Sequence, residues 1–197
     1  MPKLYIVRHG QTDSNLRSAC IGHKDVALNI AGEEQARKLA EKLADIDFDI
    51  VYTSPLSRAV NTIMPTINMK KGIKLVMNYG LIERDFGIMD DMNFEEIKEK
   101  FPEEYEKWMS DKIFYRPPGG ESVEDVQKRA GETVDKIINA HKESNILIVS
   151  HGAIIRTILA HILGLSPEQS RIFYADNAHI AVLDYKDGEW TLEGLNI

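Results

Sequence analysis

The sequence contains very little cysteine and no long apolar run. Cys20 is the single cysteine among 197 residues, so no disulfide forms within the chain. No apolar stretch approaches the roughly 20 residues that a membrane-spanning helix requires. Residues 1–3 lead directly into a strand-like segment, without the features of a secretion signal. We therefore expect a cytoplasmic protein with no membrane partner.

Positive charge is also scarce. The chain holds 24 Lys and Arg residues against 31 Asp and Glu residues, which gives a formal net charge of −7 at pH 7. An acidic surface argues against nucleic acid or an anionic membrane as the main partner. A small anionic ligand remains possible, because a local cluster of arginines outweighs a diffuse negative field at short range. The expected assembly is a monomer or a homodimer.

Two common phosphate-binding motifs are missing. The sequence has no glycine-lysine P-loop and no glycine-rich dinucleotide fingerprint after its first predicted strand. Cys20 has no arginine shortly downstream that could close a phosphate-binding loop. We therefore interpret Cys20 as a small buried hydrophobic residue or an incidental thiol.

The order of apolar segments predicts the fold class. Apolar runs of strand type alternate with segments of helical period, which is typical of an α/β three-layer sandwich. We expect one domain over 1–197, with a mostly parallel central sheet, helices on both faces and an antiparallel C-terminal hairpin. Strands are predicted at about 3–8, 48–53, 73–77, 145–150, 178–185 and 190–195, and helices at about 30–44, 56–67, 122–141 and 153–163.

The pattern is weaker between residues 86 and 121. Short helices are predicted at about 94–101 and 103–109, followed by a stretch rich in proline and glycine. Such a segment is typical of an excursion over the edge of a sheet. We expect it to act as a lid or as a wall of the substrate site.

Two distant segments, 4–10 and 146–152, share one local design. Each is a β-branched run that reads as a buried strand, ends in a histidine and continues through a glycine. If both strands lie in one sheet, their carboxyl ends bring His9 and His151 to the edge where open α/β sheets bind ligands. A lone histidine at a strand end is more often structural, but two in matched contexts favour a reaction site.

Two arginines are predicted at the same edge. Arg8 precedes His9, and Arg58 lies about one turn into a helix whose first turn suits Pro55. Guanidinium forks match phosphate oxygens, and an imidazole serves either as a neutral nucleophile or as a cationic donor. Two arginines and two histidines around one cavity therefore indicate phosphoryl transfer.

A zinc site is an alternative interpretation of the same residues. It would combine His9 and His151 with a carboxylate such as Asp13 or Glu83. The adjacent guanidinium of Arg8 would repel a divalent ion, so we expect no metal.

The chain resembles the histidine phosphatase superfamily, also called the phosphoglycerate-mutase-like family. The resemblance covers nearly the whole length and depends on four blocks in the right order. These blocks are Arg8-His9-Gly10-Gln11-Thr12 with Asn15, then Gly22 with Asp25, Leu28, Gly32, Gln35 and Ala36, then Thr53-Ser54-Pro55-Leu56-Ser57-Arg58-Ala59 with Thr62, and finally Ser150-His151-Gly152.

The resemblance implies a role for each site residue. A neutral His9 would attack phosphorus while the arginines and a protonated His151 hold the phosphate oxygens. Glu83 would donate a proton to the leaving group and then activate water, with Asp85 as the fallback acid. No metal or organic cofactor is implied. The implied catalytic residues are Arg8, His9, Arg58, Glu83 and His151, and the implied substrate contacts are Arg8, Asn15, Gly22, Arg58, His151 and Gly152.

The sequence departs from the family pattern in three places. After Gly87 it continues with Ile88-Met89-Asp90-Asp91, where many relatives have a bulky residue followed by Glu and Gly. Ile21 precedes Gly22 where a hydroxyl or amide side chain is frequent, so only backbone N–H groups would contact phosphate there. Asn61 replaces a common glutamine.

The resemblance favours the phosphatase branch. The connection between Glu83 and His151 is shorter than the substrate-covering insertion typical of the mutases. The expected activity is that of a histidine acid-type phosphatase, a metal-independent phosphomonoester hydrolase that forms phosphohistidine on a small phosphorylated metabolite. The alternatives are a cofactor-dependent phosphoglycerate mutase and a catalytically silent, phosphate-binding regulatory protein.

Overall fold

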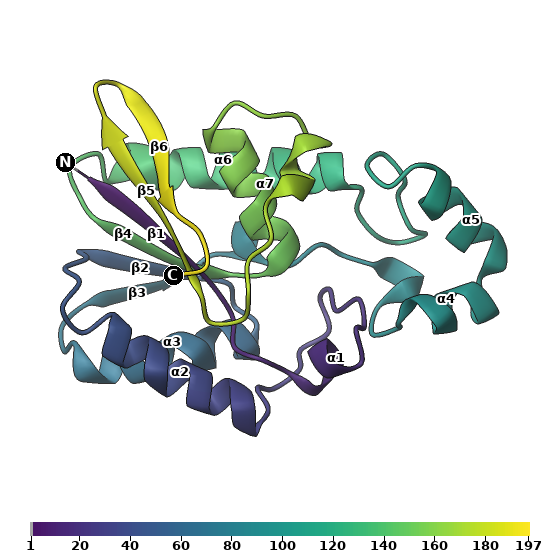
Figure 1. The fold of residues 1–197 in the computed structure, drawn as a ribbon, viewed down its shortest axis with the longest axis horizontal. Coiled ribbons are helices and arrows are strands. Elements are labelled where there is room, and N and C mark those ends of the chain that lie inside the picture. The colour runs from purple at the N-terminus through teal and green to yellow at the C-terminus, as the bar shows by residue number, and fades with distance from the viewer. Residues whose placement is uncertain (1) are drawn as a thin grey trace.

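The structure, a computed structural model, describes residues 2–197. Its six-stranded sheet has the order β3-β2-β4-β1-β5-β6 (Figure 1). The first four strands of that order run parallel, whereas β5 is antiparallel to both β1 and β6. The strands are β1 (Lys3–Arg8), β2 (Ile50–Thr53), β3 (Lys74–Met77), β4 (Ile146–Ser150), β5 (Ile180–Lys186) and β6 (Glu189–Gly194). The predicted fold class is confirmed.

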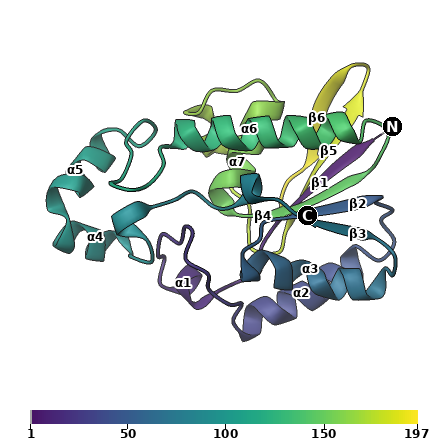
Figure 2. The ribbon, with the colours of Figure 1, turned by 180° about the vertical axis from the view of Figure 1, so that it is seen from behind.

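Helices cover both faces of the sheet. Figures 1 and 2 show α6 and α7 on one side and α2 and α3 on the other. The helices are α1 (Asp13–Leu16), α2 (Ile30–Lys42), α3 (Ser57–Met69), α4 (Phe94–Lys100), α5 (Pro102–Ser110), α6 (Val123–Ala140) and α7 (Gly152–Ile162), with short 3₁₀ turns η1 (Tyr79–Leu81), η2 (Gly87–Met89) and η3 (Gln169–Ile172). Among residues 2–197, no helix is both long and apolar enough to cross a membrane.

The alternation of side chains along each strand produces two separate cores. In β1, Leu4 and Ile6 pack with the cluster under α6 and α7, whereas Tyr5 and Val7 pack with the cluster under α2 and α3. The central strand β4 is buried along its whole length. Continuous burial explains why the strand reads as an unbroken apolar run in the sequence.

Helix α6 begins where the sequence predicts. The Ser122 side chain accepts a hydrogen bond from the Asp125 backbone N–H, and the Asp125 side chain accepts one from the Ser122 N–H. This capping box satisfies two backbone donors that no helix can satisfy internally. The apolar stripe that follows is buried against the sheet and α7, as expected for packing.

Several element boundaries differ from the prediction by one or two residues, and for two of them the structure shows why. Helix α3 begins at Ser57, so Pro55 lies before the helix rather than in its first turn. The Asp25 carboxylate accepts hydrogen bonds from the Ser57 backbone and hydroxyl, which fixes the start of the helix from a distant loop. Strand β5 begins at Ile180 rather than 178, because Ala178 is in the left-handed region with φ 57°.

The segment 86–121 extends beyond the sheet on the side of α1 (Figure 1). Its helices α4 and α5 enclose a small cluster of their own around Met89, Ile97 and Trp108. The Arg84 guanidinium lies 5.6 Å from the Trp108 ring centroid and covers one side of this cluster. A lid function for the segment stays a prediction.

Candidate active site

The carboxyl ends of β1 and β4 bring two imidazoles together. Because Arg8 pairs with Ser150 in the parallel register, the residues that follow them, His9 and His151, lie side by side. Their ring centroids are 5.1 Å apart, and both side chains are buried. The shared strand design therefore does predict a shared position.

His9 is held as a neutral imidazole with one nitrogen free. Its Nδ1–H donates to the Gly10 carbonyl over 2.7 Å, which leaves the lone pair on Nε2. Burial and the charges of Arg58 and Arg8 hold the pKa of His9 well below its usual value. The side chain is therefore prepared as a nucleophile at neutral pH.

His151 is also neutral, which corrects the expectation of a protonated ring. The Arg58 Nε–H donates to His151 Nδ1 over 3.2 Å, and a guanidinium only donates, so Nδ1 carries no proton. Nε2 is then the protonated nitrogen and donates to the Ser54 hydroxyl over 2.7 Å. Burial and the neighbouring Arg58 and His9 hold the pKa of His151 well below its usual value.

The two predicted arginines keep their charge available for an anion. The Arg58 side chain is buried and donates to the carbonyls of Lys24 and Gly22 over 2.9 and 2.8 Å. Arg8 donates to the Ala175 carbonyl over 2.8 Å, and its buried Nε has no partner. Within residues 2–197, neither arginine forms an ion pair with a carboxylate. Two fixed charges without a direct carboxylate partner therefore face the site.

Glu83 lies at the same cavity, 8% exposed. One carboxyl oxygen accepts the Arg84 backbone N–H over 2.8 Å, and the other accepts the Ala153 N–H at the start of α7 over 3.2 Å. Glu83 is therefore a buried carboxylate of the site, and within residues 2–197 it forms no ion pair with the neighbouring Arg84 guanidinium. Asp85, the fallback acid, does not line the cavity and lies 3.4 Å from His23 instead.

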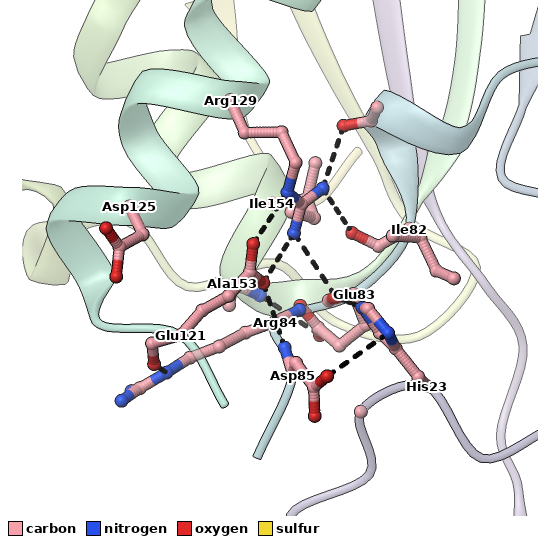
Figure 3. A network of polar contacts seen from close by, with 12 residues as sticks. His23, Ile82, Glu83, Arg84, Asp85, Glu121, Asp125, Arg129, Ala153 and Ile154 are labelled. Carbon is pink, nitrogen blue, oxygen red and sulfur yellow. Dashed lines mark hydrogen bonds and ion pairs between the residues drawn. The ribbon is translucent and has the colours of Figure 1, made fainter. Parts of the chain in front are cut away.

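A network behind Glu83 was missed in the sequence (Figure 3). Arg129 on α6 donates to the carbonyls of Gly80, Ile82 and Glu83, over 3.0, 3.0 and 3.4 Å. The same guanidinium forms a two-pronged contact with the Glu121 carboxylate over 2.8 and 2.7 Å. One side chain thus fixes the backbone that carries Glu83. Its helical position alone gave no signal of this, because the acceptors are backbone atoms of a distant turn.

The residues surround a cavity of about 240 Å³. Six of the sequence-predicted site residues line it, namely Arg8, His9, Asn15, Arg58, Glu83 and Gly152, whereas His151 lies behind the wall. The Asn15 carbonyl oxygen accepts from Thr12, and its amide nitrogen has no partner among residues 2–197. Of the segment 86–121, Phe86 alone reaches the wall.

Gly22 is not a substrate contact in this structure, which corrects the prediction. Its N–H donates to the Asp90 carboxylate over 2.6 Å, and the residue does not line the cavity. Asp90 belongs to the segment that departs from the family pattern. Its neighbour Asp91 forms ion pairs with Arg17 and Lys24. Asp90 and Asp91 therefore hold the loop before α2 in place, and neither of them lines the cavity.

Several other wall residues were not predicted from the sequence as ligand contacts. Arg156 lies four residues after Gly152 on α7, a helical spacing that points to the same face. Phe173 and Tyr174 come from an irregular segment without periodicity. Cys20, predicted as buried, is half-buried at the wall, and burial raises the pKa of its thiol to about 11, so it is not a thiolate at neutral pH.

The residues named for the alternative zinc site do not form a set of metal ligands. Among residues 2–197, no group of three or more histidine, cysteine or acidic side chains is close enough to hold a metal ion. Asp13 is exposed and accepts a hydrogen bond from Asn29, and it does not line the cavity.

Known proteins resemble this chain in sequence and in fold. A family model, "Histidine phosphatase superfamily (branch 1)", matches residues 4–197. The chain belongs to the histidine phosphatase superfamily. It is 34% identical over 197 residues to the uncharacterized phosphatase PhoE of Bacillus subtilis, covering 100% of this chain and 95% of the relative.

Both phosphatases and mutases occur among its relatives. A 2,3-bisphosphoglycerate-dependent phosphoglycerate mutase of Cytophaga hutchinsonii is 34% identical over 171 residues, covering 85% of this chain and 80% of the mutase. The crystal structure of the alpha-ribazole phosphatase from Shigella flexneri superposes with a TM-score of 0.93 at 27% identity, covering 99% of this chain and 96% of that one. The histidine phosphatase fold and family are thus shown.

Proposed function

We propose that this chain is a phosphomonoester hydrolase that works without a metal through a phosphohistidine on His9. The observation that carries the proposal is the state of His9, a buried neutral imidazole with a free Nε2 beside two arginines that form no ion pair with a carboxylate of residues 2–197. Such a site favours a phosphate dianion and offers it a nucleophile.

The first step transfers the phosphoryl group to the enzyme. The lone pair of His9 Nε2 forms a bond to phosphorus as the bond from phosphorus to the ester oxygen breaks. A protonated Glu83 gives its proton to the leaving alkoxide, so the products are an alcohol and phosphohistidine. Arg8 and Arg58 offset the charge that spreads over the remaining phosphate oxygens.

The second step restores the enzyme. The Glu83 carboxylate takes a proton from water, whose oxygen bonds to phosphorus as the phosphorus–nitrogen bond breaks. Inorganic phosphate leaves, and His9 is again neutral. His151 supports both steps by accepting the hydrogen bond from Arg58 Nε, which fixes the guanidinium against the phosphate site.

Coverage of the relatives supports a phosphatase over a mutase. The chain spans 95% of PhoE and 96% of the alpha-ribazole phosphatase, but 80% of the mutase. A mutase must hold the phosphorylated intermediate away from water. The single contribution of segment 86–121 to the cavity wall, Phe86, provides little cover for that purpose.

The proposed substrate is a small phosphorylated metabolite. A cavity of about 240 Å³ admits a compact ester, and the net charge of −7 repels larger polyanions such as nucleic acid. We propose that the chain acts in the cytoplasm as a monomer or a homodimer.

A panel of phosphomonoesters tests the proposal. The enzyme is assayed in EDTA for free phosphate and for isomerised ester, alongside His9→Ala. The proposal expects phosphate release that EDTA leaves unchanged, no isomerised product, and loss of turnover in a folded His9→Ala variant. Isomerisation would support the mutase alternative. Phosphate binding without turnover would support a silent regulatory protein, and activity lost in EDTA and restored by zinc would overturn the metal-free mechanism.

A further inference from the structure

Arg156 is an arginine without a protein partner in the wall of the catalytic cavity. Its side chain is mostly buried, and its Nε is fully buried with no hydrogen-bond partner. The Arg156 side chain forms no hydrogen bond or ion pair with another residue within 2–197. Burial lowers its pKa, but a guanidinium keeps its charge in proteins. A buried cation of this kind is unfavourable unless something compensates it.

The residues around Arg156 supply only part of that compensation. The charge of the nearby Glu83 favours the guanidinium, but the Glu83 oxygens accept backbone N–H groups and form no ion pair with Arg156. Arg171 and Arg84 are close enough for their charges to repel Arg156. A purely structural role would need a partner that the described residues do not offer.

The positive region continues beyond the catalytic cavity. Arg156 also lines an adjoining cavity of about 190 Å³, together with Arg84, Lys112 and Arg171. No acidic residue lines this second cavity. The apolar ring of Trp108 forms part of its wall. Arg156 therefore stands where the site of phosphoryl transfer meets a second space suited to anions.

From these observations we infer that Arg156 binds a second anionic group of the substrate, a carboxylate or a second phosphate. Arg8 and Arg58 hold the phosphate that is transferred, and Arg156 holds the other end of the molecule. The inference rests on the proposed function and narrows its substrate class to phosphomonoesters that carry a further negative charge. Arg156 then determines specificity, because esters that end in a neutral group leave its charge unpaired.

Matched substrates test this assignment. Phosphate esters of straight-chain hydroxy acids of two to five carbons, with the phosphate on the terminal hydroxyl, are compared with the corresponding primary amides. The amides have the same shape without the charge. At the chain length that fits, we expect the acid to exceed the amide by about tenfold or more in kcat/KM, as a charge-assisted hydrogen bond provides. The same chains ending in a phosphonate show whether a carboxylate or a second phosphate is preferred.

Variants assign the preference to Arg156. Arg156→Gln should abolish it through a higher KM for the acid, while the amide changes by less than about threefold. Arg156→Lys should retain part of the preference, because the charge stays and the fork is lost. Arg37→Gln on α2, an exposed arginine paired with Glu34, removes the same charge far from the cavity and should change nothing. A preference that persists in Arg156→Gln, or none at any chain length, would overturn the inference.

Binding separates this inference from the proposed function. Titration calorimetry of 3-phosphonopropionate against propylphosphonate measures recognition without turnover. The subsite is supported, even if no ester is hydrolysed, when the wild type binds 3-phosphonopropionate more tightly than propylphosphonate and Arg156→Gln loses that difference. Equal binding of the two compounds contradicts the subsite even if hydrolysis proceeds. Because Arg156 has no protein partner, the glutamine variant should melt at or above the wild-type temperature, which guards against a folding artefact.

Discussion

At the residue scale, the two buried imidazoles make folding sensitive to mild acid. His9 and His151 stay neutral when folded, but titrate near 6.5 in the unfolded chain. Below about pH 6.5 the unfolded state therefore binds protons that the folded state does not. As the pH is lowered below about 6.5, the free energy of unfolding should fall by about 1.4 kcal/mol per pH unit for each of the two histidines.

Urea denaturation between pH 5 and pH 7 checks this slope. Carboxylates whose pKa is lowered, such as Glu121, act only below about pH 4.5 and do not interfere. His9→Gln should remove about half of the slope. A variant with the full wild-type slope would show that His9 is not the group responsible.

Glu83 should matter most where the leaving group needs a proton, because its role in hydrolysing phosphohistidine is the same for every ester. Glu83→Gln should slow alkyl phosphates by about 100-fold or more, because an alkoxide leaves poorly without protonation. Activated aryl phosphates should slow far less. Steady-state kinetics on one alkyl and one nitrophenyl ester measure the difference, with Asp85→Asn as control. Equal slowing of both esters would count against Glu83 as the acid.

At the scale of elements, the loop after β1 packs closely on the first turn of α2. A Cβ at Gly32 would lie 2.1 Å from the Gln11 carbonyl oxygen, and one at Gly10 would lie 2.7 Å from the Gly32 carbonyl oxygen. The backbone of the loop that carries His9 therefore rests directly on the helix. Alanine favours helix by about 1 kcal/mol, but here the clash should dominate.

Gly32→Ala should thus lower the free energy of unfolding by about 1–2 kcal/mol, measured by urea denaturation. Gly152→Ala is the matched control, because a Cβ there meets nothing closer than 3.6 Å. The control should fold with unchanged or greater stability. Equal stability of the two variants would contradict the close approach.

Arg129 joins α6 to the turn that carries Glu83. Arg129→Ala would remove the side-chain donor to the Gly80 and Ile82 carbonyls, one of two donors to the Glu83 carbonyl, and the ion pair of Glu121, at an expected cost of about 2–4 kcal/mol. Because the backbone of Glu83 loosens, hydrolysis of alkyl esters should fall more than that of aryl esters. Arg129→Lys should recover only part of both losses. Arg116→Ala, which breaks an exposed ion pair with Asp125, should change stability by less than about 0.5 kcal/mol.

Periodic elements were predictable, and connecting segments were not. The strands and helices around the sheet follow apolar patterns that reflect burial on one face, and the two strand-end histidines inherit their position from the sheet. Residues 173–179 have no such pattern. They act through hydrogen bonds that involve backbone carbonyls. The Ala175 carbonyl accepts from Arg8, and the Asn177 side-chain amide donates to the His9 carbonyl. A single sequence carries no local signal for contacts between its two ends.

The prediction that Gly22 contacts the substrate failed for the same reason, a contact between distant parts of the chain. The sequence places a glycine at the expected spacing, but the Asp90 carboxylate that occupies its N–H lies 68 residues away along the chain. Likewise, the neutral state of His151 depends on the hydrogen bond that the Arg58 Nε–H donates to its Nδ1. Spacing predicts which residues meet, whereas hydrogen-bond direction decides what each of them does.

At the scale of the whole molecule, a phosphate bound at the cavity should stabilise the entire fold. The cavity wall draws on β1, α3, α7 and the segment before β5, so global unfolding destroys the site. At 100 times its dissociation constant, inorganic phosphate should add about 2.7 kcal/mol. For a domain of this size that corresponds to a rise in melting temperature of about 5–10 °C.

Thermal melts with and without phosphate measure the rise. Arg8→Gln, which removes one of the proposed phosphate ligands, should show a much smaller rise at the same concentration. Arg37→Gln should respond like the wild type. A rise of equal size in all three proteins would indicate a general salt effect instead of binding at the cavity.

The position of β1 in the sheet has a consequence for how the protein is made. Among strands β1–β6, the first to be translated lies between β4 and β5, which follow it by about 140 and 175 residues. Until then β1 has no partner on either edge, and the nascent chain must keep this apolar strand from aggregating. The site is therefore complete only after β4 and the segment before β5 have been made, so a polypeptide truncated before them would be inert toward phosphate esters and dependent on chaperones.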